Sequence, residues 1–371
     1  MSHQQDTKII SNVQYFFMMI VVINSFGHFV YVHLALTYAG RDTWLSLVLS
    51  SAISLAILWL HAKLNQWKQH ETLTEFAVTM MGSWFGIPLS MLYFLYFLTI
   101  STVTVRILID FLNLIYPATP QEVWLFLIFA VLAWVSFAGL EVLARTTQFL
   151  LPILITLGIS ASLLGIIGKD PAEILPIFDQ GFIPVWQGAV IFIAMIAETI
   201  VFTTIAPHIA RRDKLVRQSL WFSLLLLVLF IGPTTGPVML FGEYLAKRFT
   251  YPTNAELQYI EIRNIIPRMD IIGIVLWTIG AYLRAAVFSY ASITTLTRLV
   301  KENNIKFFSL AIVSIIMVAT TVMAQSRTHL LQFMMVTYPV IAIFMGIAFP
   351  ALLAVAYIIL QRKKVGHIDQ S

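Results

Sequence analysis

Cysteine is absent from all 371 residues of the chain. Disulfides, thiolate nucleophiles and Cys-ligated metal sites are therefore excluded. Charged residues are scarce: Asp, Glu, Lys and Arg make up 11% of the chain, against about a quarter in ordinary soluble domains. Because 59% of the residues are hydrophobic, the composition excludes an ordinary soluble domain and predicts an all-α, polytopic membrane protein.

Motifs for metal, phosphate and nucleophilic chemistry are also missing. His28 and His33 are not one helical turn apart with a third metal ligand nearby. Neither a P-loop nor a G-x-S-x-G nucleophile elbow occurs. We therefore expect no enzyme activity, no metal site and no cofactor. The net charge of +5 is what Lys and Arg retained in cytoplasmic segments would produce, so it does not indicate nucleic acid.

About ten apolar runs are long enough to cross a bilayer as helices. The first is too long for a signal-peptide core and lacks a small-residue cleavage site, so we expect it to remain in the mature protein. We expect one transmembrane domain at 10–360, between cytoplasmic termini at 1–9 and 361–371. The predicted spans are Ile10–Tyr38, Thr43–Leu64, Ile87–Ile115, Gln121–Ala138, Thr146–Ile167, Val185–Pro207, Ser219–Phe241, Ile271–Leu299, Phe307–Ala324 and Met335–Leu360.

The Lys and Arg residues between the spans predict the orientation. With the N-terminus inside, the cytoplasmic segments hold fourteen and the outer segments seven. Cytoplasmic loops carry the excess of positive charge, so both termini are expected in the cytoplasm. Two connections predict short helices. One is residues 71–82, with a cap at Thr72 and Glu75 three residues later. The other is the segment 242–268, which predicts a loop, a cap at Pro252-Thr253-Asn254 and a short amphipathic helix on the outer side.

The middle of the first span is polar, with the sequence Asn24-Ser25-Phe26-Gly27-His28. Backbone can leave the helix at membrane depth only where protein or a water-lined cavity satisfies its polar groups. An interrupted first helix beside a cavity is one interpretation. The other is that Gly27 lets a neighbouring helix approach while Asn24 and His28 bond across helices.

The sixth span has an unusual centre too, because Glu198 lies near mid-membrane and Thr199 follows it. Ten spans divide as five plus five, and the sixth opens the second half. Paired interruptions at corresponding positions indicate the substrate site of an inverted-repeat transporter. We therefore predict a five-plus-five inverted repeat with interrupted helices 1 and 6.

Ionisable residues within spans are costly and are candidates for function. Glu198 has no opposite charge in its own span, so it is protonated, paired with another span or bound to a cation. Arg284 in the eighth span is its candidate partner, and both are candidates for ion or proton coupling; a buried structural bridge is the alternative. Arg106 and Asp110 lie four apart in the third span and are predicted to form a structural pair.

Three segments together resemble the membrane-embedded B subunits of bacterial spore germinant receptors. The similarity runs from about Ser11 to the end of the tenth span. The segments are Gly139-Leu140-Glu141-Val142-Leu143-Ala144-Arg145 followed by Pro152, Ala39-Gly40-Arg41-Asp42-Thr43-Trp44-Leu45-Ser46, and Ile265-Ile266-Pro267-Arg268-Met269-Asp270 with Trp277 after it.

This family is similar to the amino acid-polyamine-organocation transporters. The resemblance implies a subunit of the spore inner membrane that senses a small germinant such as an amino acid. It also implies partnership with an A subunit, which has its own membrane domain, and a lipoprotein C subunit. The implied ligand residues are Asn24, Ser25, Gly27 and His28, then Tyr93, Tyr96 and Phe97, then Ala197, Glu198 and Thr199, and in span eight Tyr282, Val287 or Ser289.

Free N–H groups after a break near Gly27 would suit a carboxylate, and an ammonium group would face carbonyls or Glu198. The Asn24–His28 stretch is bulkier than the Gly-rich break of many relatives. A smaller ligand or a less fully opened helix is therefore an alternative. A proton-coupled amino acid permease and a purely structural assembly subunit remain alternative functions.

Overall fold

The computed structural model describes residues 10–68, 71–166, 168–209, 211–259, 270–302, 305–323 and 326–368. In lipid, each backbone polar group must find its partner within the protein, which favours helices in long apolar runs. The helices are α1 Asn12–Phe26, α2 Val32–Ala39, α3 Thr43–Trp67, α4 Leu73–Ile115, α5 Gln121–Ala138, α6 Leu140–Leu164, α7 Phe182–Ala197, α8 Phe202–Ile205, α9 Leu215–Arg248, α10 Pro252–Tyr259, α11 Asp270–Leu299, α12 Ile305–Val322, α13 Arg327–Gln332, α14 Tyr338–Ile343 and α15 Phe349–Ile368.

Nine helical stretches among the described residues are long and apolar enough to cross a membrane. The first of them, Asn12–Trp67, contains two of the predicted spans. The chain reverses direction in it at a short 3-10 turn, Gly40–Asp42, where Gly40 has φ of 56°. Helices long and apolar enough for the ten predicted spans are therefore present, and the chain is an integral membrane protein.

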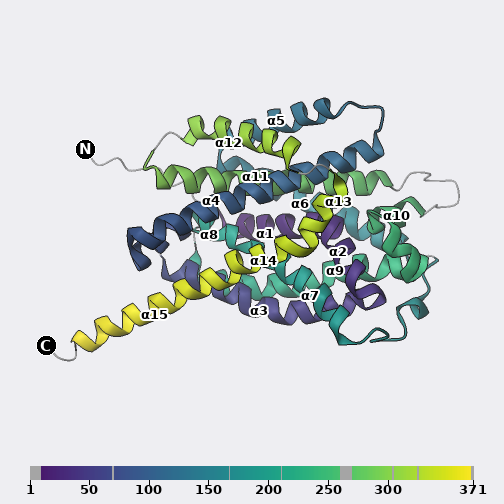
Figure 1. The fold of residues 1–371 in the computed structure, drawn as a ribbon, viewed down its shortest axis with the longest axis horizontal. Coiled ribbons are helices and arrows are strands. Elements are labelled where there is room, and N and C mark those ends of the chain that lie inside the picture. The colour runs from purple at the N-terminus through teal and green to yellow at the C-terminus, as the bar shows by residue number, and fades with distance from the viewer. Residues whose placement is uncertain are drawn as a thin grey trace.

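Several boundaries differ from the prediction. The last span begins with α13 at Arg327, and α15 continues past residue 360 to Ile368. Residues 1–9 and 265–269, the latter part of a family motif, lie outside the described residues. The start of α1 and the end of α15 lie at the same end of the molecule (Figure 1). Which end faces the cytoplasm remains a prediction from the Lys and Arg distribution.

The short helix predicted at residues 71–82 forms the first part of α4. Thr72 is its N-cap, and a capping box joins Thr72 and Glu75 as the sequence predicts. Gly82, with φ of 75° and ψ of 168°, then redirects the chain into the third span. The second predicted short helix is α10, which packs against α9 and α11 at the end of the molecule opposite the end of α15. We call that opposite end the α10 end.

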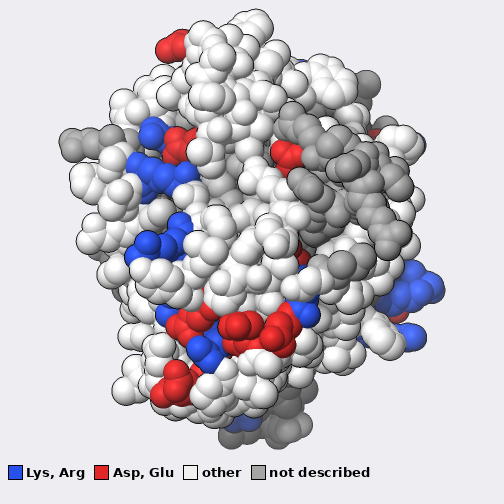
Figure 2. All heavy atoms as spheres, turned by 90° about the vertical axis from the view of Figure 1, so that its right-hand side faces the viewer, with Lys and Arg blue, Asp and Glu red and all other residues white. Residues whose placement is uncertain are grey.

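Charged side chains gather in clusters on the α10 end, among apolar surface (Figure 2). One cluster is centred on the Glu243 carboxylate, which accepts hydrogen bonds from Arg41, Lys247 and Gln180. These residues come from the first reversal, α9 and the connection before α7. The cluster thus joins three segments at this end.

Spans one and six lie at the centre of the bundle. In the most apolar window of Phe182–His208, 94% of the residues are buried, against 22% in that of Leu140–Leu164. Both central spans depart from regular α-helix where the sequence predicts interruptions. Span one has a π-helical segment, Gly27–Tyr31, and span six has a 3-10 segment, Glu198–Val201. Span ten contains two further π-helical segments, Phe333–Thr337 and Phe344–Ala348.

Candidate ligand-binding site

The 3-10 segment of span six holds Glu198 in the middle of the bundle, with 0% of its side chain exposed. Its Oε1 atom accepts a hydrogen bond from Tyr31 Oη at 2.5 Å and one from Arg284 Nη2 at 2.8 Å. The Tyr338 hydroxyl donates to the same oxygen. Because charged acceptors make the stronger hydrogen bonds, this carboxylate firmly connects spans one, six, eight and ten.

Arg284 completes the network from the other side. Its Nη1 atom lies 2.6 Å from Glu198 Oε2 and donates to the Val22 carbonyl at 2.9 Å. Its Nε atom donates to Thr104 Oγ1 at 3.1 Å, which adds span three. The guanidinium also lies 4.5 Å from the centre of the Phe26 ring. The predicted pairing of Glu198 with Arg284 is present, and five spans meet at it.

A second set of contacts connects span ten to spans two, three and six. The π-helical segment Phe344–Ala348 presents carbonyls to side chains: Met345 O accepts from Tyr93 Oη at 2.7 Å, and Gly346 O lies 2.6 Å from His61 Nε2. The other ring nitrogen of His61 lies 2.9 Å from Thr199 Oγ1. Widened turns are frequent at functional sites because they release backbone groups for such contacts.

Span one does not unwind at its polar centre. The Gly27 N–H bonds to the Ile23 and Asn24 carbonyls, and the Val32 N–H bonds to the Gly27 carbonyl, so the helical ladder continues as π-helix. The expected half-helix with free N–H groups is therefore not observed. A Cβ atom on Gly27 would lie 2.2 Å from Phe230 Cζ. Gly27 allows close packing, which is the alternative that the sequence left open.

The other polar residues of this stretch have different surroundings. The His28 ring packs edge-on against Phe230 with 4.4 Å between ring centres, and the His28 carbonyl accepts from Thr253. Asn24 Oδ1 is buried without a hydrogen-bond partner among the described residues. The side chain of Ser25 lies outside the described part of the chain.

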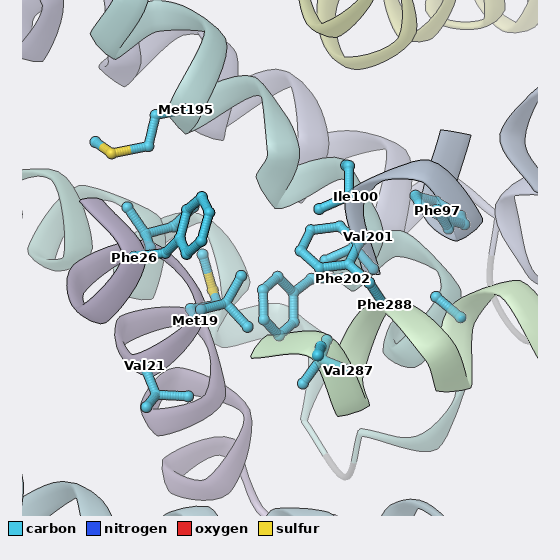
Figure 3. Close-up of a cluster of buried hydrophobic side chains, with 14 of the residues drawn as sticks. Met19, Val21, Phe26, Phe97, Ile100, Met195, Val201, Phe202, Val287 and Phe288 are labelled. Carbon is cyan, nitrogen blue, oxygen red and sulfur yellow. The ribbon is translucent and has the colours of Figure 1, made fainter. Parts of the chain in front are cut away.

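Apolar side chains fill the centre where the sequence predicts a cavity (Figure 3). Met19, Phe26 and Phe97 point into this cluster from spans one and three, with Phe288 from span eight. The remaining predicted ligand residues Tyr93, Tyr96, Ala197, Thr199, Val287 and Ser289 are buried, and Tyr282 is partly buried. Ser289 Oγ and the Tyr282 hydroxyl have no hydrogen-bond partner among the described residues. A ligand at the centre therefore requires apolar side chains to move.

The predicted pair in span three is present near the α10 end. Arg106 Nε lies 3.1 Å from Asp110 Oδ1, and Arg106 Nη1 donates to the Thr320 carbonyl at 3.2 Å. No cluster of three or more His, Asp and Glu side chains that could hold a metal ion occurs among the described residues.

Sequence reasoning missed several members of the central network. Tyr31 and Tyr338 were missed because neither carries a charge that would mark it as a candidate, although a buried Tyr hydroxyl also needs a partner. His61 did carry a signal, because it is an ionisable residue inside the second predicted span. Lys68, just beyond that span, is also buried, and its Nζ donates to the Glu71 and Thr203 carbonyls.

Two solved transporters share this fold. One is MHP1, a nucleobase-cation-symport-1 family transporter in a closed conformation with bromovinylhydantoin bound; the TM-score is 0.61 and the identity 13%, covering 88% of this chain and 75% of that one. The other is MhsT in complex with L-phenylalanine, at a TM-score of 0.59 and 12% identity, covering 94% and 96%. These likenesses show a transporter-type fold.

Curated relatives have similar sequences over most of the chain. Spore germination protein XB of Bacillus anthracis is 26% identical over 300 residues, which cover 79% of this chain and 84% of the relative. Spore germination protein KB of Bacillus subtilis strain 168 is 26% identical over 275 residues, covering 72% and 73%. A sequence model of the spore permease type, described as spore germination protein, matches residues 9–329. The chain therefore belongs to the spore germination protein family of the spore permease type.

Proposed function

We propose that this protein is the membrane subunit of a spore germinant receptor, which binds a small germinant and signals to A and C partner subunits. The observation that carries the proposal is the buried pair of Glu198 and Arg284, which joins five spans of a transporter-type fold. Membership of the spore germination family supports the biological role. An amino acid is the germinant that we expect, and the spore inner membrane is the expected location, with both termini in the cytoplasm.

The pair offers a physical route from binding to signalling. An amino acid carries the same two charged groups as the pair. Its carboxylate can compete with Glu198 for Arg284, and its ammonium group can compete with Arg284 for Glu198. Such an exchange would loosen the contacts between spans one, eight and ten. A ligand shifts the equilibrium between two conformations only by its difference in affinity for them, and this exchange would supply that difference.

Ser289 provides a test that spares the folded structure. Its buried Oγ has no hydrogen-bond partner among the described residues, so Ser289→Ala removes no internal hydrogen bond. Ser292→Ala is the matched control, because Ser292 lies in the same helix as Ser289, α11. Its Oγ already has a partner, since it donates to the Phe94 carbonyl of α4 at 3.4 Å. We would measure binding of radiolabelled amino acids to purified protein in lipid nanodiscs.

We expect Ser289→Ala to weaken binding of the accepted amino acid at least fivefold, while Ser292→Ala leaves it unchanged. Equal binding by both variants and the unmodified protein would rule out a ligand at this position. Gly27→Trp is a poor test of the same site, because even a Cβ atom at Gly27 collides with Phe230.

A proton-coupled amino acid permease is the second candidate. The buried carboxylate of Glu198 and the likeness to transporter folds favour it. Such a permease requires Glu198 to leave Arg284 and take up a proton during transport. Proteoliposomes containing the Glu198→Gln variant should then lose pH-gradient-driven uptake. Uptake that continues unchanged would remove Glu198 from proton coupling.

A further inference from the structure

A small pocket opens near the α10 end, away from the Glu198 and Arg284 pair. Its walls come from span one, α4, α13 and the segment that precedes α10. Its volume is about 10 Å³, enough for about one water-sized group. Apolar side chains such as Phe29 and Leu330 line it together with five polar residues, His33, Asp110, Thr250, Tyr251 and Arg327.

Positively charged side chains outnumber carboxylates around the pocket. The Asp110 carboxylate pairs with Arg106 at 3.1 Å. The guanidinium of Arg327 lies instead over the Tyr251 ring, 4.6 Å from its centre, and pairs with no carboxylate of the described residues. This region therefore holds two guanidinium groups, those of Arg106 and Arg327, and the one carboxylate of Asp110, which pairs with Arg106. An arginine that stacks on an aromatic ring keeps the N–H groups at the edge of its planar guanidinium available to a carboxylate that lies in the same plane.

Three buried polar atoms on side chains that line the pocket lack hydrogen-bond partners among the described residues. They are Asp110 Oδ2, His33 Nδ1 and Tyr251 Oη. Leaving a buried polar atom unpaired costs about 1–3 kcal/mol in general, so each unpaired group in a native protein calls for a ligand, a water molecule or a functional reason. An ammonium group is about the size of the recess and donates three hydrogen bonds.

We propose that this pocket binds the charged head group of a small α-amino acid. The ammonium group occupies the recess and donates to Asp110 Oδ2 and His33 Nδ1, and the carboxylate lies at the mouth on Arg327. The remainder of the ligand faces out of the pocket, because the recess has room for the ammonium group alone. This site does not depend on binding at the centre of the bundle.

Trp277 can report whether the pocket is occupied. It stacks on Phe29 with 5.6 Å between ring centres, and Phe29 in turn stacks on Tyr251 at 4.4 Å. The full chain labelled with 5-fluorotryptophan in nanodiscs would be observed by fluorine NMR, and Trp277→Phe identifies the Trp277 signal. The probes are glycine, sodium acetate and methylamine hydrochloride at equal ionic strength.

We expect glycine to shift the Trp277 signal, acetate to bind at least tenfold more weakly, and methylamine to produce no shift. Arg327→Gln should weaken glycine binding at least tenfold. Arg248→Gln is the matched control: Arg248 also stacks on a tyrosine, 4.2 Å from the Tyr244 ring, but does not line the pocket. Asp110→Asn should reduce the affinity for glycine to that for acetate.

Four results would overturn the proposal: no shift with glycine, equal glycine affinity in the Arg327→Gln variant, an equal response to methylamine and glycine, or loss of the glycine response in the Ser289→Ala variant. The Ser289→Ala variant separates this site from the central one. The glycine response of Trp277 should persist in that variant. If it disappears, the signal reports the central site and the proposal for the α10 end fails.

Discussion

Glu198 and Arg284, 86 positions apart, form an ion pair of 2.6 Å with 0% and 1% of their side chains exposed. Removing a charge from water costs several kcal/mol, which a buried pair recovers only with good geometry and additional hydrogen bonds. The additional hydrogen bonds are present: Tyr31 and Tyr338 donate to Oε1 of the carboxylate, while Val22 and Thr104 accept from the guanidinium. The pair therefore stabilises one arrangement of the spans.

Single and double substitutions of the pair should lower the free energy of unfolding by different amounts. Arg284→Met leaves the Glu198 carboxylate buried without its counter-ion, and we expect a loss of about 3–5 kcal/mol in the free energy of unfolding. Adding Glu198→Gln removes the stranded charge, so the double variant should be more stable than Arg284→Met alone. Thermal unfolding of detergent-solubilised protein, followed by intrinsic fluorescence, measures this. If the loss in the double variant equals the sum of the losses in the two single variants, the two side chains are not coupled.

Tyr338→Phe should destabilise the protein through the same carboxylate. The variant loses a hydrogen bond to a charged acceptor, for which we expect a cost of about 1.5–3 kcal/mol. Tyr259→Phe serves as the control because Tyr259 is exposed, and its effect should stay within about 0.5 kcal/mol. Thermal unfolding of both variants gives the comparison. A Tyr338→Phe protein as stable as the control would contradict the hydrogen bond to Glu198.

Gly346→Ala should disturb the contact between spans ten and six. A Cβ atom on Gly346 would lie 2.3 Å from the Ala197 carbonyl oxygen and 2.7 Å from Ala197 Cβ. We expect a loss of about 1–3 kcal/mol, as for other overpacked interiors. Gly158→Ala is the matched control, since nothing lies within 4 Å of its Cβ position in α6 and helix propensity favours Ala. Unfolding midpoints that fall equally in both variants would refute the close contact.

Lys68, which lies outside the membrane-spanning segments, should make stability depend on pH. Burial lowers the pKa of its ammonium group well below the usual range, and Arg212 adds to the effect. Between this lowered pKa and the unfolded value of about 10.4, the unfolded chain binds more protons than the folded one. Stability from this group therefore rises with pH through that window.

Lys68→Met should remove that dependence. We expect the unfolding midpoint of the unmodified protein to increase, relative to that of the variant, as the pH rises towards the unfolded pKa of about 10.4. Melting curves of both proteins across this range test the sign. A parallel response of the two proteins would show that Lys68 keeps an ordinary pKa in the folded state.

Interactions between residues of one helix could be predicted from the sequence, because helix geometry fixes which residues lie next to each other. Arg106 and Asp110 lie one turn apart, so their pairing needs no knowledge of other helices. The cap formed by Thr72 and Glu75 is equally local. The sites of irregular helix near Gly27 and Glu198 were also predicted, because polar residues at membrane depth mark them.

The form of those irregularities could not be predicted. A polar centre in span one is compatible with an unwound helix and with a π-helical segment that keeps its hydrogen bonds. The choice depends on how closely Phe230 approaches Gly27, which is a property of the packed bundle. The same packing fills the expected cavity with apolar side chains.

The number of apolar spans, about ten, and the charges that lie inside them follow from the amino-acid sequence alone. Apolar runs and buried charges are local properties, and lipid leaves the backbone few alternatives to a helix. The convergence of Tyr31, Tyr338 and Arg284 on Glu198 became visible in the folded bundle. Their contacts depend on the rotation and register of helices that are far apart along the chain, and packing of the whole bundle sets both.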